Sequence, residues 1–372
     1  GTVHQPYHLE WDHWTASGCL AAWAGLERLR CCPCQVLLPA HGPAVATRPR
    51  ACIERAQRRL LALVRAKGSV CAGARQQWVD MEPLPSGARR ILPHLYQFGA
   101  NSYLLVGQGQ EGLVVDPQLP DLDALEPLLA EAGVRRVTVG TASHYHSDHS
   151  DGLNALRERY QAATWLHPRV ADPLRDRDRW EVPWLPRQSV LIDRLLPAEG
   201  SFRWGGYQLA SHDYPGQTRW HAAIDGRIDG CRVLFSGDNY QPPTRWNGTG
   251  GFCAYNGSRF DAEGFVRSAG LALRIAPDMV CNGHGCAYWF RPDHYRRILR
   301  WVPRAQRAVT ALCPEGDLSE HYAPRCARWE PFVSSASPGD TVGLELLLTE
   351  PQARARGASV AALAPPGWTV TA

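Results

Sequence analysis

Four side chains of the types that bind metal ions stand within one hexapeptide, directly after a short apolar run. The run is Arg136–Thr141, and the side chains are those of His144, His146, Asp148 and His149. Its β-branched residues predict a short strand, so the cluster is expected in the loop that leaves a strand. In an extended loop, residues two apart point the same way, and both imidazoles can then hold one ion. The next two residues can turn toward a second ion.

Similar polar side chains recur at the ends of other apolar runs. Asp116, Asp238 and His284 each follow a short stretch rich in valine, leucine or other apolar residues. The strand-like stretches alternate with helix-like ones. Metal-binding side chains at strand ends, in an alternation of strands and helices, indicate an α/β layered fold.

The elements around the cluster have recognisable patterns. Residues 84–118 predict a hairpin of extended strands, and leucines at helical spacing over Asp121–Ala132 predict an amphipathic helix with Asp121 as its N-cap. Arg296–Leu312 repeats apolar residues at helical spacing, and we expect Pro303 to break that helix. This last element would close the domain.

The hexapeptide His144–His149 resembles the His-x-His-x-Asp-His signature of the metallo-β-lactamase superfamily. The resemblance continues in chain order: Asp116 resembles the supporting aspartate of the family, Asp238 its bridging aspartate and His284 its last metal histidine. It implies a catalytic domain at residues 84–313 with the αββα sandwich of that family.

The resemblance also implies the site and its chemistry. The expected metal ligands are His144, His146, Asp148, His149, Asp238 and His284. Two Zn²⁺ ions are expected, with iron or manganese as alternatives, and the substrate would be a small molecule. Such ions activate a water molecule, which here would hydrolyse an ester, thioester, lactone, amide or phosphodiester bond. Asp148 would orient the nucleophile and hold the second ion.

One element departs from the family pattern. The family has a Gly-His-Thr segment before the bridging aspartate, whereas Pro215–His221 carries Gln217 at the ligand position. Either Gln217 contributes a neutral amide oxygen, or His221 supplies the missing imidazole; we expect Gln217 at the first ion and His221 nearby. His212 is expected to be a surface or supporting residue. The departure also permits a mononuclear-iron sulfur dioxygenase of the same superfamily.

The two ends of the chain differ from the centre. Residues 1–78 are expected to be mainly helical and resemble the end of another domain of this kind. Residues 324–372 contain a period-2 strand and no helix signal, which predicts the start of an immunoglobulin-like β-sandwich. Such a multi-domain arrangement also leaves open an alternative function, in which the chain is a non-catalytic domain of this family within a multi-domain binding protein.

Composition excludes several classes of protein. A net charge of +4, from 40 basic and 36 acidic residues that are scattered along the chain, leaves no clear nucleic-acid footprint. No apolar run approaches the ~20 residues of a membrane span. The start of the sequence has no export signal, and the 12 cysteines are expected to be mostly reduced, which favours the cytoplasm. The oligomeric state is not predicted.

Overall fold

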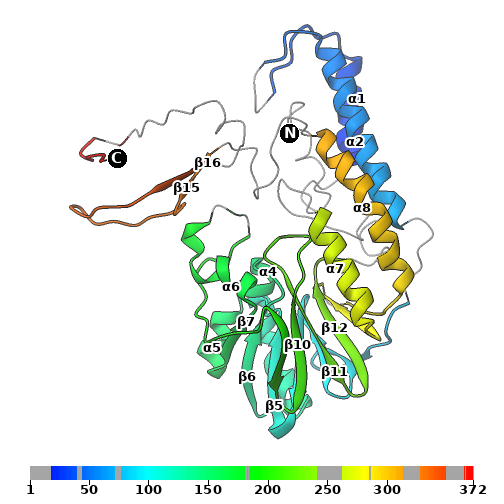
Figure 1. Cartoon of the computed structure of the whole chain (residues 1–372), viewed down its shortest axis with the longest axis vertical. Coiled ribbons are helices and arrows are strands. Elements are labelled where there is room, and N and C mark those ends of the chain that lie inside the picture. Colours follow the sequence, from blue (N-terminus) through cyan, green and yellow to red (C-terminus); the bar gives the residue numbers. More distant parts are fainter. Residues whose placement is uncertain are drawn as a thin grey trace.

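Two β-sheets face each other, and helices cover their outer faces (Figure 1). The computed structural model describes residues 18–39, 44–71, 77–180, 182, 184–240, 262–284, 286–312, 327–348, 364 and 366–371. None of the helices in these ranges is both long and apolar enough to cross a membrane.

The first sheet has eight strands that follow one another in space as they do in sequence. They are β1 (Glu82–Pro83), β2 (Arg89–Leu92), β3 (Leu95–Phe98), β4 (Ser102–Gly107), β5 (Glu111–Val115), β6 (Arg136–Thr141), β7 (Ala163–Leu166) and β8 (Arg194–Leu195). Neighbours from β1 to β5 are antiparallel, and those from β5 to β8 are parallel. The predicted strands over 84–118 and 136–141 are confirmed.

The second sheet has six strands in the order β14-β13-β12-β11-β10-β9. They are β9 (Glu199–Trp204), β10 (Tyr207–Asp213), β11 (Ala222–Ile228), β12 (Cys231–Gly237), β13 (Met279–Asn282) and β14 (Cys286–Trp289). All neighbours are antiparallel except β12 and β13. Each sheet thus contains parallel neighbouring strands. The carboxyl ends of these strands lie at one end of the sandwich, and the polar loops leave the sheets there.

The space between the two sheets is filled by alternate side chains of their strands. Along β4, Tyr103 and Leu105 contribute to a buried cluster that also contains Phe235 of the second sheet. The intervening Leu104 and Val106 belong to a cluster on the other face of the sheet, with the helices. A strand whose two faces are both buried is apolar throughout, as this one is.

Helices complete the four layers. The first sheet is accompanied by η2 (Gln108–Gln110), η3 (Leu119–Asp121), α3 (Leu122–Glu131), α4 (Ser147–Ser150), α5 (Leu153–Tyr160), α6 (Pro168–Arg175) and η4 (Arg177–Arg179), and the second by α7 (Ala262–Ile275) and α8 (Pro292–Leu312). Leucines of α3 and α5 pack on the first sheet, and α7 and α8 pack on the second. The predicted α/β class with an αββα sandwich is confirmed.

Two N-terminal helices extend the outer layer of the second sheet. They are α1 (Gly18–Cys31) and α2 (Pro49–Cys71), which lie beside α8 in Figure 1. Leu26, Ile53 and Leu60 of these helices belong to one buried cluster with Phe265 and Trp301 of α7 and α8. The helices therefore share a hydrophobic core with the central domain. That residues 1–78 derive from the end of another such domain stays a prediction.

Two local expectations are wrong. Helix α8 begins at Pro292 and continues through Pro303, because buried side chains on both sides of the proline, such as Trp301, hold the helix against the core. Asp121 does not cap α3 with its side chain. Its carboxylate instead accepts backbone N–H groups of Ala100 and Asn101, at 2.9 and 3.1 Å, and so fixes the turn between β3 and β4.

Near the C-terminus, β15 (Ala327–Glu330) and β16 (Glu345–Leu348) form a two-stranded antiparallel sheet. The predicted start of a β-sandwich is, within the described residues, only this small sheet. Glu330 forms an ion pair with Arg179, and the backbone N–H of Val333 donates to the Asp178 carbonyl at 2.9 Å. The sheet thereby contacts η4.

Candidate metal centre

The predicted site residues come together where loops leave the two sheets. Ser143 and the hexapeptide after it follow β6, and the backbone at His144 forms an antiparallel bridge with that at His221. The N–H of Ala222, at the start of β11, donates to the Ser143 carbonyl at 2.7 Å. These contacts join the two sheets at the edge where Asp238 also lies.

His144 and His146 face each other. The Nε2 atom of His144 lies 2.9 Å from Nδ1 of His146, and both side chains are buried. Two nitrogens this close can converge on a single ion. The other nitrogen of His144, Nδ1, lies 3.0 Å from the Ser143 hydroxyl, which fixes the orientation of the ring.

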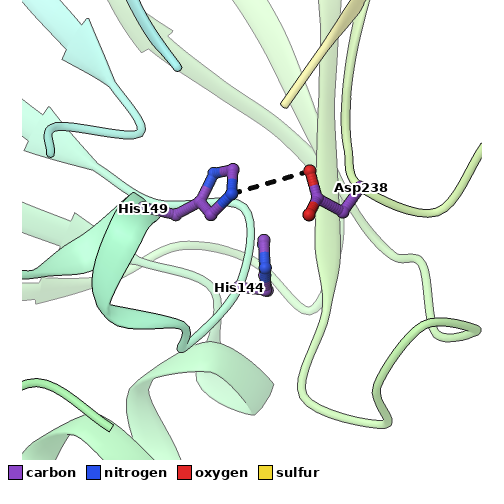
Figure 2. Close-up of side chains that lie close together, drawn as sticks. All are labelled: His144, His149 and Asp238. Carbon is purple, nitrogen blue, oxygen red and sulfur yellow. Dashed lines mark ion pairs between the residues drawn. The ribbon is translucent and has the colours of Figure 1, made fainter. Parts of the chain in front are cut away.

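His149 occupies the middle of the cluster. Its Nε2 lies 3.4 Å from Asp148 Oδ2 and 3.5 Å from Asp238 Oδ1, the ion pair drawn in Figure 2. Among the residues that the structure describes, possible ligand atoms within 4.8 Å of one another occur in two groups that share this histidine. The first is His144, His149 and Asp238, and the second is Asp148, His149 and His284.

Asp238 belongs to the first group and contacts the second through His284. Its Oδ2 accepts a hydrogen bond from Gln217 Nε2 at 2.8 Å and lies 3.0 Å from His284 Nε2. Its Oδ1 has no hydrogen-bond partner among the described residues. A carboxylate placed in this way can offer one oxygen to each of two ions.

Asp116 supports two of the histidines. It stands at the end of β5 with φ +53°, a conformation that is uncommon for a residue other than glycine. Its carboxylate accepts the N–H and the hydroxyl of Ser143, at 2.6 and 2.8 Å, and Ser143 in turn contacts His144. Its Oδ2 also lies 3.2 Å from His149 Nδ1, an ion-pair distance without the geometry of a hydrogen bond. Carboxylates behind ligand histidines orient their rings.

Two positions around the centre require glycine. A Cβ atom on Gly283 would lie 2.3 Å from Asp238 Oδ1 and 2.8 Å from His149 Cε1. Gly237 has φ +49°, and a Cβ there would lie 2.6 Å from His221 Nε2. The backbone can approach the cluster this closely because both side chains are absent.

Burial keeps most of the histidines neutral. It lowers the pKa of His144 well below the ordinary value, and lowers the pKa of His146 to about 4 and that of His221 to about 3. Nearby histidines act in the same direction for His144. Neutral imidazoles have the free lone pairs that metal binding requires.

The remaining groups form a strongly coupled set of opposite charges. Burial lowers the pKa of His149, but the carboxylates of Asp148, Asp238 and Asp116 outweigh it and raise that pKa well above its ordinary value. Burial raises the pKa of Asp148, but the attraction of His149 outweighs it and lowers that pKa. Likewise, the attraction of His284 and His149 holds the pKa of Asp238 well below its ordinary value against the effect of burial. The carboxylates of Asp148 and Asp238 are therefore ionised and give the site negative charge that attracts a cation.

The residues fit a metal ion by a further observation. Within the described parts of the chain, Asp238 Oδ1, Gln217 Oε1 and both ring nitrogens of His149 are buried without a hydrogen-bond partner. Buried polar atoms are rarely left unsatisfied. A cation would satisfy Asp238 Oδ1, Gln217 Oε1 and Nε2 of His149, since nitrogen and oxygen donors are the ligands that zinc accepts, while Nδ1 of His149 faces Asp116.

His221 and His212 have different surroundings. His221 is fully buried, and its ring stacks on that of His144 with centroids 4.9 Å apart. Its Nε2 accepts the backbone N–H of Asp238 at 3.2 Å. His212 lies away from the cluster, with its nitrogens 2.7 Å from Asp225 and 3.1 Å from Glu199.

Three contributors were missed from sequence. Ser143 links Asp116 to His144, and Asn101 donates to the Asp148 carbonyl at 2.7 Å and to its carboxylate at 3.3 Å. The ring of Trp184 lies 5.2 Å from that of His146. The position of Ser143 next to His144 was a usable signal, whereas Asn101 and Trp184 approach the site only in the folded chain.

Comparison with known proteins identifies the family of the chain. The family model described as "Metallo-beta-lactamase superfamily" matches residues 95–284, slightly more than half of the 372 residues. The fold, the histidine–aspartate cluster and this match together define a metallo-hydrolase. The chain belongs to the metallo-beta-lactamase superfamily.

The individual proteins that the chain resembles have low sequence identity to it. The acyl-coenzyme A thioesterase MBLAC2 of Gallus gallus is 31% identical over 187 residues, which cover 44% of this chain and 66% of that protein. The match thus spans just under two thirds of the relative. Among solved structures, the MIM-2 metallo-beta-lactamase is 16% identical with a TM-score of 0.47, covering 67% of this chain and 98% of that one. The subclass B3 enzyme BJP-1 of Bradyrhizobium japonicum is 15% identical with a TM-score of 0.44, covering 61% and 92%.

Proposed function

We propose that this chain hydrolyses thioesters of a small-molecule acyl carrier, with two metal ions held by a catalytic domain at residues 84–313. The observation that carries the proposal is that Asp238 belongs to one group of metal-binding side chains and also contacts His284 of the other, at 3.0 Å. The thioester is favoured among the possible bonds because the relative at 31% identity is named an acyl-coenzyme A thioesterase.

The first ion would be held by His144 and His146 with one oxygen of Asp238, and by Oε1 of Gln217. This amide oxygen is buried without a partner, while Gln217 Nε2 already donates to Asp238. His221 is excluded from this role through Nε2, because that atom accepts the Asp238 N–H. The second ion would be held by Asp148, His149 and His284 with the other oxygen of Asp238.

Bound ions supply two things: they lower the pKa of a water molecule toward ~7, and they polarise the carbonyl of the substrate. The protein orients the reactants. Asp148 has 38% of its side chain exposed, so it can contact a water molecule that enters from solvent. Because its carboxylate is ionised and held by Asn101, it can accept a hydrogen bond from this water and direct a lone pair at the carbonyl carbon.

Hydrolysis then forms a carbon–oxygen bond and breaks the carbon–sulfur bond. The products are a carboxylic acid and a thiol. Asp116 and Ser143 hold the histidine rings in place throughout, so the cluster is ordered before the substrate arrives.

The experiment is metal analysis of the purified protein, followed by a screen of thioester, ester, lactone and phosphodiester substrates. We expect about two zinc ions per chain and hydrolysis of thioesters above the others. About one iron per chain with oxygen consumption would instead identify the sulfur dioxygenase reaction. Zinc-dependent hydrolysis of another bond would retain the site and overturn the substrate class.

A further inference from the structure

Trp184 lies against the metal centre. Its ring centroid is 5.2 Å from that of His146, and the two ring planes are inclined by 69°. The indole is half-buried. Part of it is therefore exposed to solvent beside a proposed metal ligand.

The backbone holds this tryptophan in an unusual conformation. Trp184 has φ +58°, in the left-handed region that bulky side chains rarely adopt. Its carbonyl accepts the N–H of Ser147 at 2.7 Å, at the start of the helix that carries Asp148 and His149. The hydrogen bond fixes Trp184 to the same turn as the metal-binding side chains.

Described residues close to Trp184 in the chain make further contacts. Arg177 Nε donates to the Pro186 carbonyl at 3.0 Å. Trp180 packs edge-on against Trp220, with centroids 4.9 Å apart, and Trp220 is close in sequence to Gln217. Trp180 and Trp220 are buried. Trp184 is more exposed than either, so it can offer an apolar face to a ligand.

We propose that Trp184 determines specificity by contacting the apolar acyl chain of a substrate whose carbonyl lies at the metal centre. A carbonyl bound there lies within a few ångström of His146, since metal–nitrogen distances are about 2 Å. The first methylenes of the acyl chain then reach the indole beside His146. This inference rests on the proposed hydrolase function and adds the acyl part of the substrate to it.

The test measures binding of two carboxylic acids, the product class, to the zinc-loaded protein by calorimetry. Octanoate carries an apolar chain and acetate does not. We expect octanoate to bind the wild-type protein more tightly, because each buried methylene contributes about fourfold in affinity. Trp184→Gly removes the indole and suits the left-handed backbone, so the Ser147 hydrogen bond can persist. It should lower octanoate affinity about tenfold and leave acetate affinity within about twofold.

Two further variants serve as controls, one at the same position and one at a tryptophan away from the metal centre. Trp184→Asn also tolerates the backbone conformation and should behave as Trp184→Gly does. Trp78→Ala removes the indole of a residue that is 42% exposed and whose backbone pairs with Tyr288 of the edge strand β14, and it should change neither affinity. Equal affinities of the two acids for the wild-type protein would overturn the proposal. Equal losses for both acids in both Trp184 variants would do so as well.

The same variants separate this inference from the proposed function. Hydrolysis of octanoyl and acetyl thioesters is compared in the wild-type protein and Trp184→Gly. Selective octanoate binding without thioester hydrolysis would overturn the proposed function alone. Thioester hydrolysis whose octanoyl preference is unchanged in Trp184→Gly would overturn the role of Trp184 alone.

Discussion

The side chains of the proposed metal centre differ in their exposure to solvent, which suits some of them to binding an ion and one of them to orienting water. His144, His146 and His149 are almost fully buried, whereas Asp148 is 38% exposed. A group that orients water must reach both solvent and substrate. The exposure of Asp148 suits that role, and its contact with Asn101 restrains the carboxylate.

We predict that Asp148→Asn lowers kcat by at least ~100-fold while the protein stays folded, because a positioned catalytic group typically contributes two orders of magnitude or more. Steady-state kinetics with the best thioester would measure the loss, and circular dichroism would check the fold. Near wild-type turnover with metal still bound would remove Asp148 from the mechanism.

Gln217 and His221 allow a paired test of the first metal position. Gln217→His should tighten zinc at that position, since imidazole is a better zinc ligand than an amide oxygen. His221→Ala should retain metal but lower activity, because it removes the ring that stacks on His144 and accepts the Asp238 N–H. Zinc content after dialysis measures metal binding in both variants, and steady-state kinetics measures the activity of His221→Ala. Loss of one zinc equivalent in His221→Ala, but not in Gln217→Ala, would make His221 the ligand.

Among the elements, β10 and β11 carry a charged cluster that is separate from the metal centre. His212 on β10 contacts Asp225 on β11, and Asp225 also accepts a hydrogen bond from Arg232 at 2.8 Å. Burial lowers the pKa of His212, but hydrogen bonds to Asp225 and Glu199 outweigh it and raise the pKa above its ordinary value of 6.5. The protonated imidazole therefore joins these strands.

This cluster predicts a pH-dependent stability. Because the pKa of His212 is raised by folding, its contribution is fully present below about pH 6.5 and is lost as the pH rises through the folded-state pKa. In His212→Gln we expect about 1 kcal/mol less stability on the acidic side of this range, and a smaller difference above it. Urea unfolding from pH 6 to pH 9 would measure this. A stability difference that grows with pH would contradict the assignment.

For the whole molecule, the N-terminal helices join the core on the side away from the first sheet. Ile53 of α2 is fully buried in the cluster shared with α7 and α8. The stability of the two-sheet sandwich is thus coupled to a segment that contributes no residue to the proposed metal centre within the described part of the chain.

We predict that Ile53→Ala lowers the free energy of unfolding by about 2–5 kcal/mol, through lost burial and the cavity it leaves. Metal content per folded chain should not change, because every proposed ligand lies between positions 144 and 284. Denaturation and metal analysis of the same sample give the two numbers. The exposed Leu29→Ala is the matched control, with 45% of its surface accessible, and should cost little. Loss of zinc from folded Ile53→Ala would show that the helices shape the site directly.

The sequence by itself was sufficient for features that depend on local spacing. His144, His146, Asp148 and His149 are close in the chain, so a single loop brings them together in almost any fold that places a strand before them. The strands themselves follow from apolar runs, and the layered class follows from their alternation with helices. The order of Asp116, Asp238 and His284 after such runs indicated a common edge.

Tertiary structure decided the contacts between distant segments. Asp121 has the sequence position of a helix cap, but the turn after β3 presents two N–H groups that its carboxylate binds instead. The bridge between His144 and His221 sets the register of the 215–221 segment. That register turns His221 toward the Asp238 backbone and Gln217 toward the Asp238 carboxylate. Such pairings depend on how two sheets meet, and spacing along one strand does not specify them.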